Sequence, residues 1–426
     1  MKVSLALPLL VSFCADTGSN APGFLNGQPI DGKGKGAVIL GGTNKALDLQ
    51  NPDNLGQQST DNGVVPNLKW SFSDSRTRIL RGGWVREQVI TDLPASVYIS
   101  AAQQHLTKGS IRELHWHRTA EWGYMYAGSI LLSAVNEDGQ FQVSKLEVGD
   151  IWYFPKGEAH TVQGLEDENE FLLVFDDGNF DAVGTTFNLD DWIAHTPVSV
   201  LAKNFNLSES VFGNVPSPNP YIQNGTLSSQ DQDVTGGNGP LTGNASYVYY
   251  AKDHPLEKVP GRGGTLRIVD TTTFPIATII AATIVTLEPG GLRELHWHPN
   301  VSSWTSLPLC FSFVLTAHRL LQAAEWLYFH KGQARAGVFI GNSNARTFDF
   351  SAGDTALFPD NSGHYIENIS PTEELVWIEI YKSDRVKDIS LTQWLALTPA
   401  NIVADILRIP LDVAKGIKKE KQLLIK

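Results

Sequence analysis

Hydrophobic residues along the chain occur in short runs, and glycines or prolines separate one run from the next. Clear examples lie at residues 151–154, 171–175 and 376–381. Short apolar and aromatic runs bounded by turn residues are typical of β-strands. Many such strands at close spacing predict an all-β fold in which antiparallel strands form sandwiches or small barrels.

Helical patterns follow the strand-rich regions at two places. They lie at residues 189–194 and 198–204, and again at 391–396, 402–407 and the basic stretch 415–421. Residues 221–245 are rich in Gly, Asn, Ser, Thr and Gln, a composition that is typical of exposed connections. The sequence therefore predicts β domains with short helical additions, and a linker at 221–245.

Composition limits the classes of protein that fit this pattern. The chain has 426 residues, enough for roughly two to three domains. Apolar residues make up 42% of it, which suffices for buried cores and excludes a largely disordered chain. The net charge of −12 argues against nucleic acid and against an anionic membrane as partners. An acidic secreted enzyme fits this balance better.

The first residues have the pattern of an export signal. Lys2 precedes an apolar run at 3–13, and small residues follow it. This predicts a signal peptide at 1–20, followed by an N-terminal arm at 21–66. A first buried strand or helix is the alternative. With a signal peptide, the chain would be secreted to the extracellular space.

Glycosylation sequons and cysteines bear on the same question. Asn-x-Ser/Thr occurs at Asn206, Asn224 and Asn244, which is what a secreted glycoprotein shows, although three sequons can arise by chance in a chain this long. Cys14 lies in the predicted signal, and Cys310 lies in a segment that we interpret as foreign. We therefore expect no disulfide framework, no thiolate metal site and no cysteine nucleophile.

The chain contains an internal repeat. The hexapeptide Arg-Glu-Leu-His-Trp-His occurs at 112–117 and again at 293–298, an offset of 181 residues. Further matches, among them His160 with His364, have an offset of 204 residues. Chance hardly produces a six-residue identity that contains Trp and two His. The sequence therefore predicts a duplicated domain, with copies at 67–220 and 246–426.

The change of offset indicates extra residues between His298 and Glu325. Residues 301–322 have no counterpart in the first copy. Val-Ser at the start of this segment can be encoded by a splice-donor sequence, and Leu-Gln at its end by a splice acceptor. Its 22 codons also preserve the reading frame. We therefore interpret 301–322 as a translated intron, with a genuine hydrophobic loop as the alternative.

Each copy contains three histidines and one glutamate in a pattern that suits a metal ion. The two sets are His115, His117, Glu121 and His160, and His296, His298, Glu325 and His364. On a strand, residues i and i+2 point the same way, so His-x-His places two imidazoles on one face. A carboxylate and a third imidazole from neighbouring strands can complete the site. Three N ligands and one O ligand suit Mn, Fe, Cu, Ni or Zn.

The same residues belong to two longer motifs. These are Gly109-x5-His115-x-His117-x3-Glu121-x6-Gly128 and Gly149-x5-Pro155-x-Gly157-x2-His160. They resemble the two motifs of the cupins, except that Gly164 stands where the second motif ends in Asn. The second copy fits once 301–322 are left out, with Asn361 at a motif Gly position. The chain thus resembles a bicupin, which implies two β-sandwich or jelly-roll barrel domains.

Several segments carry a more specific resemblance. Arg-Glu-Leu-His-Trp-His-Pro-Asn, Gly-His-Tyr-Ile-Glu-Asn and Phe-Asp-Asp-Gly are similar to oxalate decarboxylases, above all to the secreted fungal ones. This similarity extends from about residue 67 to 421. It implies two Mn(II) per chain, oxalate as the small-molecule partner, formate and carbon dioxide as products, and a need for O2 that is not consumed. Whether the chain forms a homo-oligomer stays open.

The resemblance assigns Arg112 and Arg293 to binding and polarising the substrate carboxylate, which a guanidinium does well. Each arginine precedes the first histidine of its copy by three residues, so in a regular strand it would point to the opposite face. Only a twist or a bulge would bring it into the pocket. A salt bridge at the rim is the alternative for both.

Decarboxylation needs groups that take up and deliver a proton. Glu379 lies in an otherwise apolar strand, where an acid is costly unless it faces a metal or a partner. It resembles the proton-transfer Glu of the family's C-terminal site, with a structural carboxylate as the alternative. At an offset of 204, Phe175 stands in its place in the first copy.

The first copy has a polar segment at 179–186 that corresponds to the mobile lid of the bacterial enzymes. Their lid carries a proton-donor Glu, whereas Asp181 is the only acid in this one. Asp181 is therefore our candidate for the lid acid, and exclusion of water is the alternative role of the lid.

Two other functions remain open. An oxalate oxidase would yield carbon dioxide and H2O2 when no acid protonates the intermediate, and product analysis separates it from a decarboxylase. A non-catalytic storage or binding bicupin is the third hypothesis, and metal analysis separates it from both enzymes.

Overall fold

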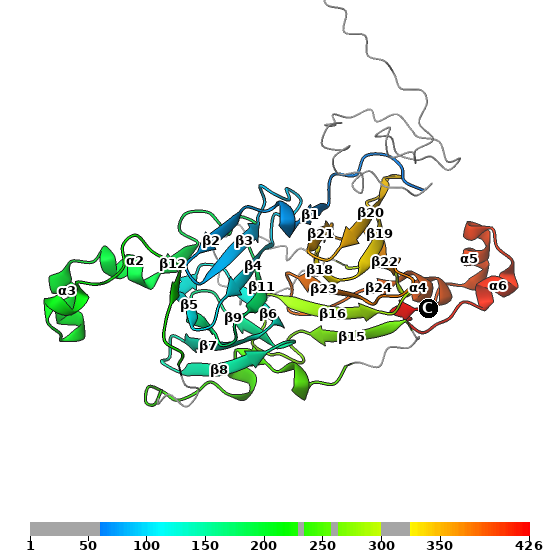
Figure 1. Ribbon diagram of the computed structural model, residues 1–426. Helices are drawn as coiled ribbons and strands as arrows, with labels where there is room; N and C mark the ends of the chain where they lie inside the picture. Colours follow the sequence, from blue (N-terminus) through cyan, green and yellow to red (C-terminus); the bar gives the residue numbers. More distant parts are fainter. Residues whose placement is uncertain (1–59, 229–233, 257–262, 300–323) are drawn as a thin grey trace, which may run out of the picture.

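The computed structural model describes residues 60–228, 234–256, 263–299 and 324–426. The predicted signal peptide, most of the predicted N-terminal arm and the segment 301–322 lie outside the described residues. Within them the chain forms two β-barrels that lie side by side, one from each copy of the repeat (Figure 1). The prediction of an all-β fold with two duplicated sandwich domains and short helical additions is confirmed.

The N-terminal barrel consists of two sheets packed face to face. The sheet next to the other barrel holds, in spatial order, β14 (Val248–Tyr249), β9 (Ile151–Phe154), β6 (Glu121–Ala127), β11 (Asn169–Phe175), β4 (Ser100–Leu106), β3 (Gly83–Gln88) and β2 (Thr77–Leu80). The opposite sheet holds β12 (Thr186–Asn188), β5 (Ser110–His117), β10 (Ala159–Gly164), β7 (Ser129–Val135) and β8 (Phe141–Glu147), and β13 (Ile222–Asn224) also pairs with β5.

The C-terminal barrel repeats this arrangement. Its inner sheet holds β1 (Lys69–Ser71), β21 (Asp354–Phe358), β18 (Glu325–Lys331), β23 (Leu375–Tyr381), β16 (Ala281–Leu287) and β15 (Gly264–Val269). Its outer sheet holds β20 (Ala345–Ser351), β19 (Gln333–Phe339), β22 (Gly363–Asn368), β17 (Leu292–Trp297) and β24 (Ile389–Ser390), and β25 (Leu424–Ile425) also pairs with β17.

The inner strands are hydrophobic on both faces because each face covers a different core. In β11, Phe171, Leu173 and Phe175 point into the barrel, whereas Leu172 and Val174 belong to the core between the two barrels. Successive side chains of a strand alternate between the faces of the sheet, so a strand between two cores is a continuous apolar run. This explains why the sequence pattern shows runs at these places and little alternation.

The core between the barrels also contains hydrogen bonds from one copy to the other. The indole Nε1 of Trp326 donates to Gln88 Oε1 at 2.7 Å, and Gln103 Nε2 donates to the hydroxyl of Tyr328 at 2.7 Å. Both indoles of the repeated Glu-Trp pair, Trp122 and Trp326, are fully buried in this core. The two copies are therefore packed as one body.

Each copy also lends a strand to the other. β1, which the predicted boundaries place in the first copy, pairs with β21 of the C-terminal barrel. β14, which they place in the second copy, pairs with β9 of the N-terminal barrel. In this detail the structure differs from the boundaries at 67 and 246.

The predicted linker is partly built into the N-terminal barrel. β13 pairs with β5, and Ile222 at its start is buried in the barrel core. The expectation of an exposed linker over all of 221–245 is therefore wrong for Ile222 and for Leu241, because both side chains are buried in the core of the N-terminal barrel.

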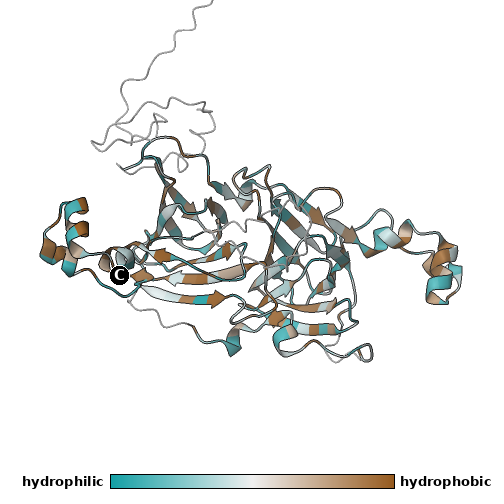
Figure 2. Cartoon of the chain, turned by 180° about the vertical axis from the view of Figure 1, so that it is seen from behind, coloured by the Kyte–Doolittle hydropathy of each residue, from teal (hydrophilic) through white to brown (hydrophobic). Residues whose placement is uncertain are grey.

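Two helical arms project from opposite ends of the molecule (Figure 1). They contain α2 (Leu189–Ala194) and α3 (Val198–Phe205), and α4 (Leu391–Ala396), α5 (Ala400–Leu407) and α6 (Leu411–Lys415). The short 3-10 turns are η3 (Phe72–Asp74), η4 (Glu209–Phe212), η5 (Gly243–Ala245) and η6 (Ala251–Asp253). Figure 2 shows apolar residues along both arms, and Trp192 and Ile406 are 62% and 75% exposed. No helix in the described part of the chain combines the length and the apolar character that a membrane span needs.

Candidate functional site

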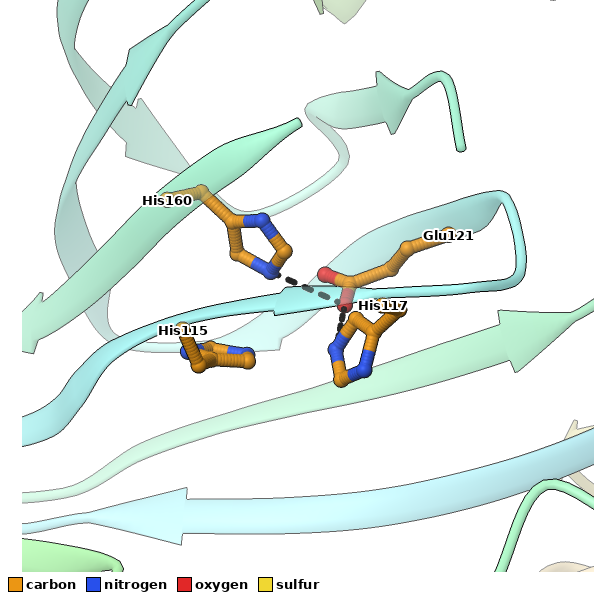
Figure 3. Close-up of side chains that lie close together, drawn as sticks. All are labelled: His115, His117, Glu121 and His160. Atoms are coloured by element: carbon orange, nitrogen blue, oxygen red, sulfur yellow. Dashed lines mark ion pairs between the residues drawn. The ribbon is translucent and has the colours of Figure 1, made fainter. Parts of the chain in front are cut away.

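The first predicted ligand set meets inside the N-terminal barrel. His115 and His117 lie on β5, Glu121 begins β6, and His160 lies on β10, and Figure 3 shows their side chains converging on one point. The carboxylate Oε2 of Glu121 lies 3.1 Å from His117 Nε2 and 3.3 Å from His160 Nε2. One ligand atom from each of the four residues lies within 4.8 Å of the others, and all four residues are buried.

This geometry fits a metal ion. Two ligand atoms at about 2.1 Å from one ion and at right angles to each other lie about 3.0 Å apart. Glu121 Oε2 and His160 Nε2 are buried, and neither has a hydrogen-bond partner within the described residues. A buried polar atom without a partner costs about 1–3 kcal/mol, and a bound cation removes that cost for both.

The second nitrogen of each histidine fixes the orientation of its ring. Nδ1 of His115 and Nδ1 of His160 lie 2.6 and 2.8 Å from backbone carbonyl oxygens, and Nδ1 of His117 lies 3.0 Å from the hydroxyl of Thr186. A nitrogen that faces a carbonyl carries the hydrogen, so Nε2 keeps its lone pair for a metal.

Burial keeps the ligands in the protonation states that a metal needs. It lowers the pKa of His117 to about 4, and it lowers the pKa of His115 well below its ordinary value, with help from the charge of Arg112. Burial alone would raise the pKa of Glu121, but the neighbouring imidazoles of His160 and His117 lower it below its ordinary value. Neutral imidazoles around an ionised carboxylate are ready to bind a cation.

The second predicted ligand set forms the same arrangement in the C-terminal barrel. Glu325 Oε2 lies 2.8 Å from His364 Nε2 and 3.3 Å from His298 Nε2, and the Nε2 atoms of His364 and His296 are 3.1 Å apart. At this centre all three Nδ1 atoms face backbone carbonyl oxygens, at 2.7 to 2.9 Å. Glu325 Oε2 is also buried without a hydrogen-bond partner in the described residues. Both centres therefore fit a metal by the same criteria.

A β-bulge brings the two arginines to the metal side. Between β5 and β10, His115 pairs with His160 and Arg112 with Val162, so β5 has one more residue than its partner over this interval. The same shift separates Arg293 from His296 on β17. One extra residue reverses the strand parity, so the arginine and the first histidine share a face. This resolves the conflict between strand alternation and the role that the resemblance assigns.

Arg112 lines the cavity that contains the first ligand set. Its guanidinium lies over the ring of Tyr221 at 3.6 Å, and its Nη1 donates to Asn188 Oδ1 at 3.2 Å. Arg112 is only 3% exposed, so it is part of the pocket and not a rim salt bridge.

Two further residues of this cavity were missed in the sequence. Tyr221 falls in the predicted linker, and Gln104 lies on β4. Both side chains line the same cavity as the first ligand set. The buried amide of Gln104 has no hydrogen-bond partner within the described residues, so it can bind a polar ligand. The sequence pattern does not single out Gln104, because four of the seven residues of β4 are polar.

Arg293 occupies the corresponding place at the second centre but has different partners. Its Nη2 donates to Asp388 Oδ2 at 2.6 Å, and its Nε lies 3.6 Å from Glu379 Oε1. Both carboxylates are buried, so the two ion pairs of Arg293 are shielded from solvent.

Glu379 is fully buried beside the second centre. Trp377 Nε1 donates to its Oε1 at 3.1 Å, and the hydroxyl of Tyr381 donates to its Oε2 at 2.8 Å. Burial, together with the charge of Glu325, raises the pKa of Glu379 above its ordinary value. A carboxyl that holds its proton to higher pH is suited to proton transfer.

The predicted counterpart of Glu379 is wrong. Tyr381 pairs with the ligand Glu325 as Phe175 pairs with Glu121, so Tyr381 and Phe175 correspond. Glu379 therefore corresponds to Leu173. The offset in this strand is 206 because the connection before β23 is two residues longer than the one before β11.

The structure does not bring Asp181 to the metal ligands. Its side chain is exposed, whereas the neighbouring Phe180 is buried and lines the cavity. Phe180 stacks on Phe175 with ring centroids 3.4 Å apart and meets His117 edge-on at 5.1 Å. The aromatic ring is buried and the carboxylate remains in water, so in this conformation the lid presents Phe180 to the centre.

Comparison with known proteins identifies the family. Residues 71–211, 251–307 and 312–410 match the sequence profile of the cupins. The chain belongs to the cupin family. This cupin is 56% identical over its whole length to the whole of a protein from Arthroderma benhamiae named "Probable oxalate decarboxylase". It is 41% identical to oxalate decarboxylase OxdC of Bacillus subtilis, over 94% of this chain and 97% of that protein.

Solved structures agree with these relatives. The structure of oxalate decarboxylase from Bacillus subtilis at pH 4.6 superposes with a TM-score of 0.79 at 40% identity, covering 92% of this chain and 96% of that one. Another structure of the Bacillus enzyme, matched with the same TM-score, comes from work on the EPR parameters of its Mn(II) centres.

The departure from the second cupin motif at Asn361 also has an explanation. Asn361 has a φ of 58°, in the left-handed region, and Gly157 at the corresponding place has a φ of 89°. Asn adopts this conformation more readily than other residues with a side chain, so it replaces the motif glycine at little cost.

Proposed function

We propose that this cupin is an oxalate decarboxylase that converts oxalate into formate and carbon dioxide. One observation carries the proposal: three curated proteins, two named oxalate decarboxylase and one named probable oxalate decarboxylase, are 41 to 56% identical to this chain over 94 to 100% of its length. Both ligand sets are complete, so the chain keeps the centres that such an enzyme needs. No observation favours oxalate oxidation or a storage role.

We infer manganese as the metal, with one Mn(II) at each centre. The donor atoms alone suit several divalent metals. The Mn(II) centres named for the solved Bacillus enzyme support manganese over the others. A bound divalent cation would supply positive charge that attracts oxalate and stabilises the negative charge that develops during the reaction. A requirement for O2 belongs to the same proposal.

The residues around the first centre can hold one end of oxalate. The guanidinium of Arg112 offers several N–H donors for a carboxylate. The ring of Tyr221 and the amide of Asn188 fix its plane, so the arginine is oriented before the substrate arrives. The amide of Gln104, which has no partner within the described residues, can bind a second oxygen of the substrate.

The reaction breaks the carbon–carbon bond, releases one carbon as carbon dioxide, and adds a proton to the other to form the C–H bond of formate. Glu379 can deliver or receive that proton at the second centre, because it is buried, hydrogen-bonded and has a raised pKa. At the first centre Asp181 remains the proposed lid acid, and its use there requires the lid to move from the described conformation.

Measurement of the products tests the proposal directly. The full chain loaded with Mn(II) should produce about one formate per oxalate consumed and little H2O2. Formation of H2O2 with two carbon dioxide molecules per oxalate would favour an oxidase instead. A chain that binds Mn(II) but consumes no oxalate would contradict both enzymatic functions.

We also propose that the protein is secreted and glycosylated. The pattern at 1–20 supports this, and Asn206, Asn224 and Asn244 are exposed, as glycan acceptors must be. N-terminal sequencing of the native protein would locate the cleavage site, and enzymatic removal of N-glycans would shift its mass. An uncleaved first residue and an unchanged mass would contradict secretion.

The projecting arms support a homo-oligomer. Their exposed aromatic and aliphatic side chains, such as Trp192 and Trp394, are the kind of surface that copies of a chain bury against each other. Light scattering on the native protein would test this, since a monomeric mass would contradict it.

A further inference from the structure

The two centres differ at one position that directly faces the ligand glutamate. On the inner sheets, Phe175 pairs with Glu121, and Tyr381 pairs with Glu325. Both side chains are buried, and their rings lie next to the corresponding histidines, His117 and His298. The C-terminal centre thus has a phenol hydroxyl where the N-terminal centre has only an aromatic ring.

The hydroxyl of Tyr381 lies between the proton-transfer acid and the metal ligands. It donates to Glu379 Oε2 at 2.8 Å and lies 3.4 Å from His298 Nε2 and 3.5 Å from Glu325 Oε1. Glu379 and Tyr381 are two residues apart on β23, so both side chains point to the same face of the sheet. The hydroxyl oxygen of Tyr381 therefore contacts both the Glu379 carboxyl and two of the metal ligands.

This hydroxyl also fixes the direction of the Glu379 carboxyl. Trp377 Nε1 donates to one carboxyl oxygen, and Tyr381 donates to the other. With both oxygens bonded, the carboxyl plane cannot rotate freely. Loss of the Tyr381 bond would leave a fully buried oxygen without its donor, and the carboxyl would turn to find another.

The first centre has neither the acid nor the phenol of the second. Leu173 stands in the place of Glu379, Phe175 stands in the place of Tyr381, and Phe180 of the lid stacks on Phe175. An apolar wall at one centre thus corresponds to a hydrogen-bonded acid and phenol at the other.

We propose that Tyr381 is a positioning residue of the C-terminal centre, which holds the carboxyl of Glu379 toward the substrate so that Glu379 transfers the proton there. This inference rests on the proposed function, because it concerns proton transfer to oxalate. Tyr381 acts through Glu379, so its contribution exists only while Glu379 is an acid.

The test uses the full chain with His117→Ala, which leaves turnover to the C-terminal centre. In this background Tyr381→Phe should lower kcat by at least about tenfold and leave KM within about twofold. Glu379→Gln should cause at least the same loss. The double variant should be no slower than Glu379→Gln alone, because residues that act through one another are not additive. Tyr328→Phe, which removes a buried hydroxyl in the core between the barrels, should leave kcat unchanged.

A second measurement does not depend on turnover. The Mn(II) EPR spectrum with saturating oxalate should differ between Tyr381→Phe and its parent, while the Mn content of the two stays equal. An unchanged kcat and spectrum, or losses that simply add in the double variant, would overturn the role of Tyr381. An inactive His117→Ala parent beside an active natural chain would overturn it as well. If the natural chain itself consumes no oxalate, the proposed function fails with it, and the EPR comparison still reports whether Tyr381 orders the centre.

Discussion

Substitution of one metal ligand tests whether the two centres are independent. His117→Ala removes the imidazole whose Nε2 lies 3.1 Å from Glu121 Oε2, and it leaves two imidazoles and one carboxylate at the first centre. The C-terminal set shares no residue with it, and the core between the barrels is mainly apolar. We therefore expect the first centre to lose its ion and the second to keep its own.

The expected size of the effect follows from binding. An ion at a hundredfold excess over its Kd stabilises the folded chain by about 2.7 kcal/mol. For a folding unit of more than 400 residues each kcal/mol corresponds to roughly 1–2 °C in Tm, because the entropy of unfolding grows with chain length. Emptying one centre should therefore lower the Tm of the Mn-loaded chain by about 3–5 °C, and the same substitution should change the Tm of the metal-free chain much less.

Metal analysis of the purified protein gives the result directly. The natural chain should contain about two Mn, the His117→Ala variant about one, and the double variant that also carries His298→Ala close to none. His195→Ala, which removes an exposed histidine on a helical arm, is the matched control and should retain both ions. Loss of both ions from His117→Ala alone would refute independent centres, and retention of both would show that His117 is not a ligand.

Three further predictions concern the lid, the extra segment and pH. Asp181→Asn should lower formate and raise H2O2 with Mn content unchanged, and an unaltered product ratio would place the proton donor elsewhere. Deletion of 301–322 should leave about two Mn per chain, because His298 and Glu325 already meet at 3.3 Å in the full chain. A mature transcript that retains the codons for this segment would contradict the intron interpretation. Burial raises the pKa of Asp61, so the folded chain binds this proton more tightly than the unfolded chain, and stability falls as pH rises above the ordinary Asp value near 3.8. Asp61→Asn should therefore gain Tm relative to natural chain at pH 7 but not at pH 3.

The ligand sets could be predicted from the sequence because the repeat presents each of them twice. Two histidines on one strand face need no tertiary information, and the equal spacing from Glu121 to His160 and from Glu325 to His364 identified the remaining ligands. Both barrels were predictable for a similar reason, since short apolar runs bounded by Gly and Pro leave few alternatives to antiparallel sheets.

Residues that depend on strand register could not be predicted in the same way. The bulge that turns Arg112 inward is one residue long and leaves no mark in the hydrophobic pattern. A two-residue difference in a connecting loop was enough to match Glu379 with Phe175 and to hide the correspondence of Phe175 with Tyr381. Tyr221 was missed because it stands at the start of a stretch rich in Gly, Asn, Ser, Thr and Gln, while its neighbours in space belong to the first centre.

The reciprocal placement of β1 and β14 has a consequence for how the duplicated gene can be divided. A fragment with only the first repeat would contain β1 but not β21, and it would leave the edge of β9 uncovered. Exposed sheet edges pair with other chains, so such a half would tend to aggregate. During synthesis on the ribosome, the first barrel cannot close its edge until residue 249 has emerged, and β1 must wait for its partner until residue 358 has been made. The ancestral duplication has thus become one inseparable folding unit.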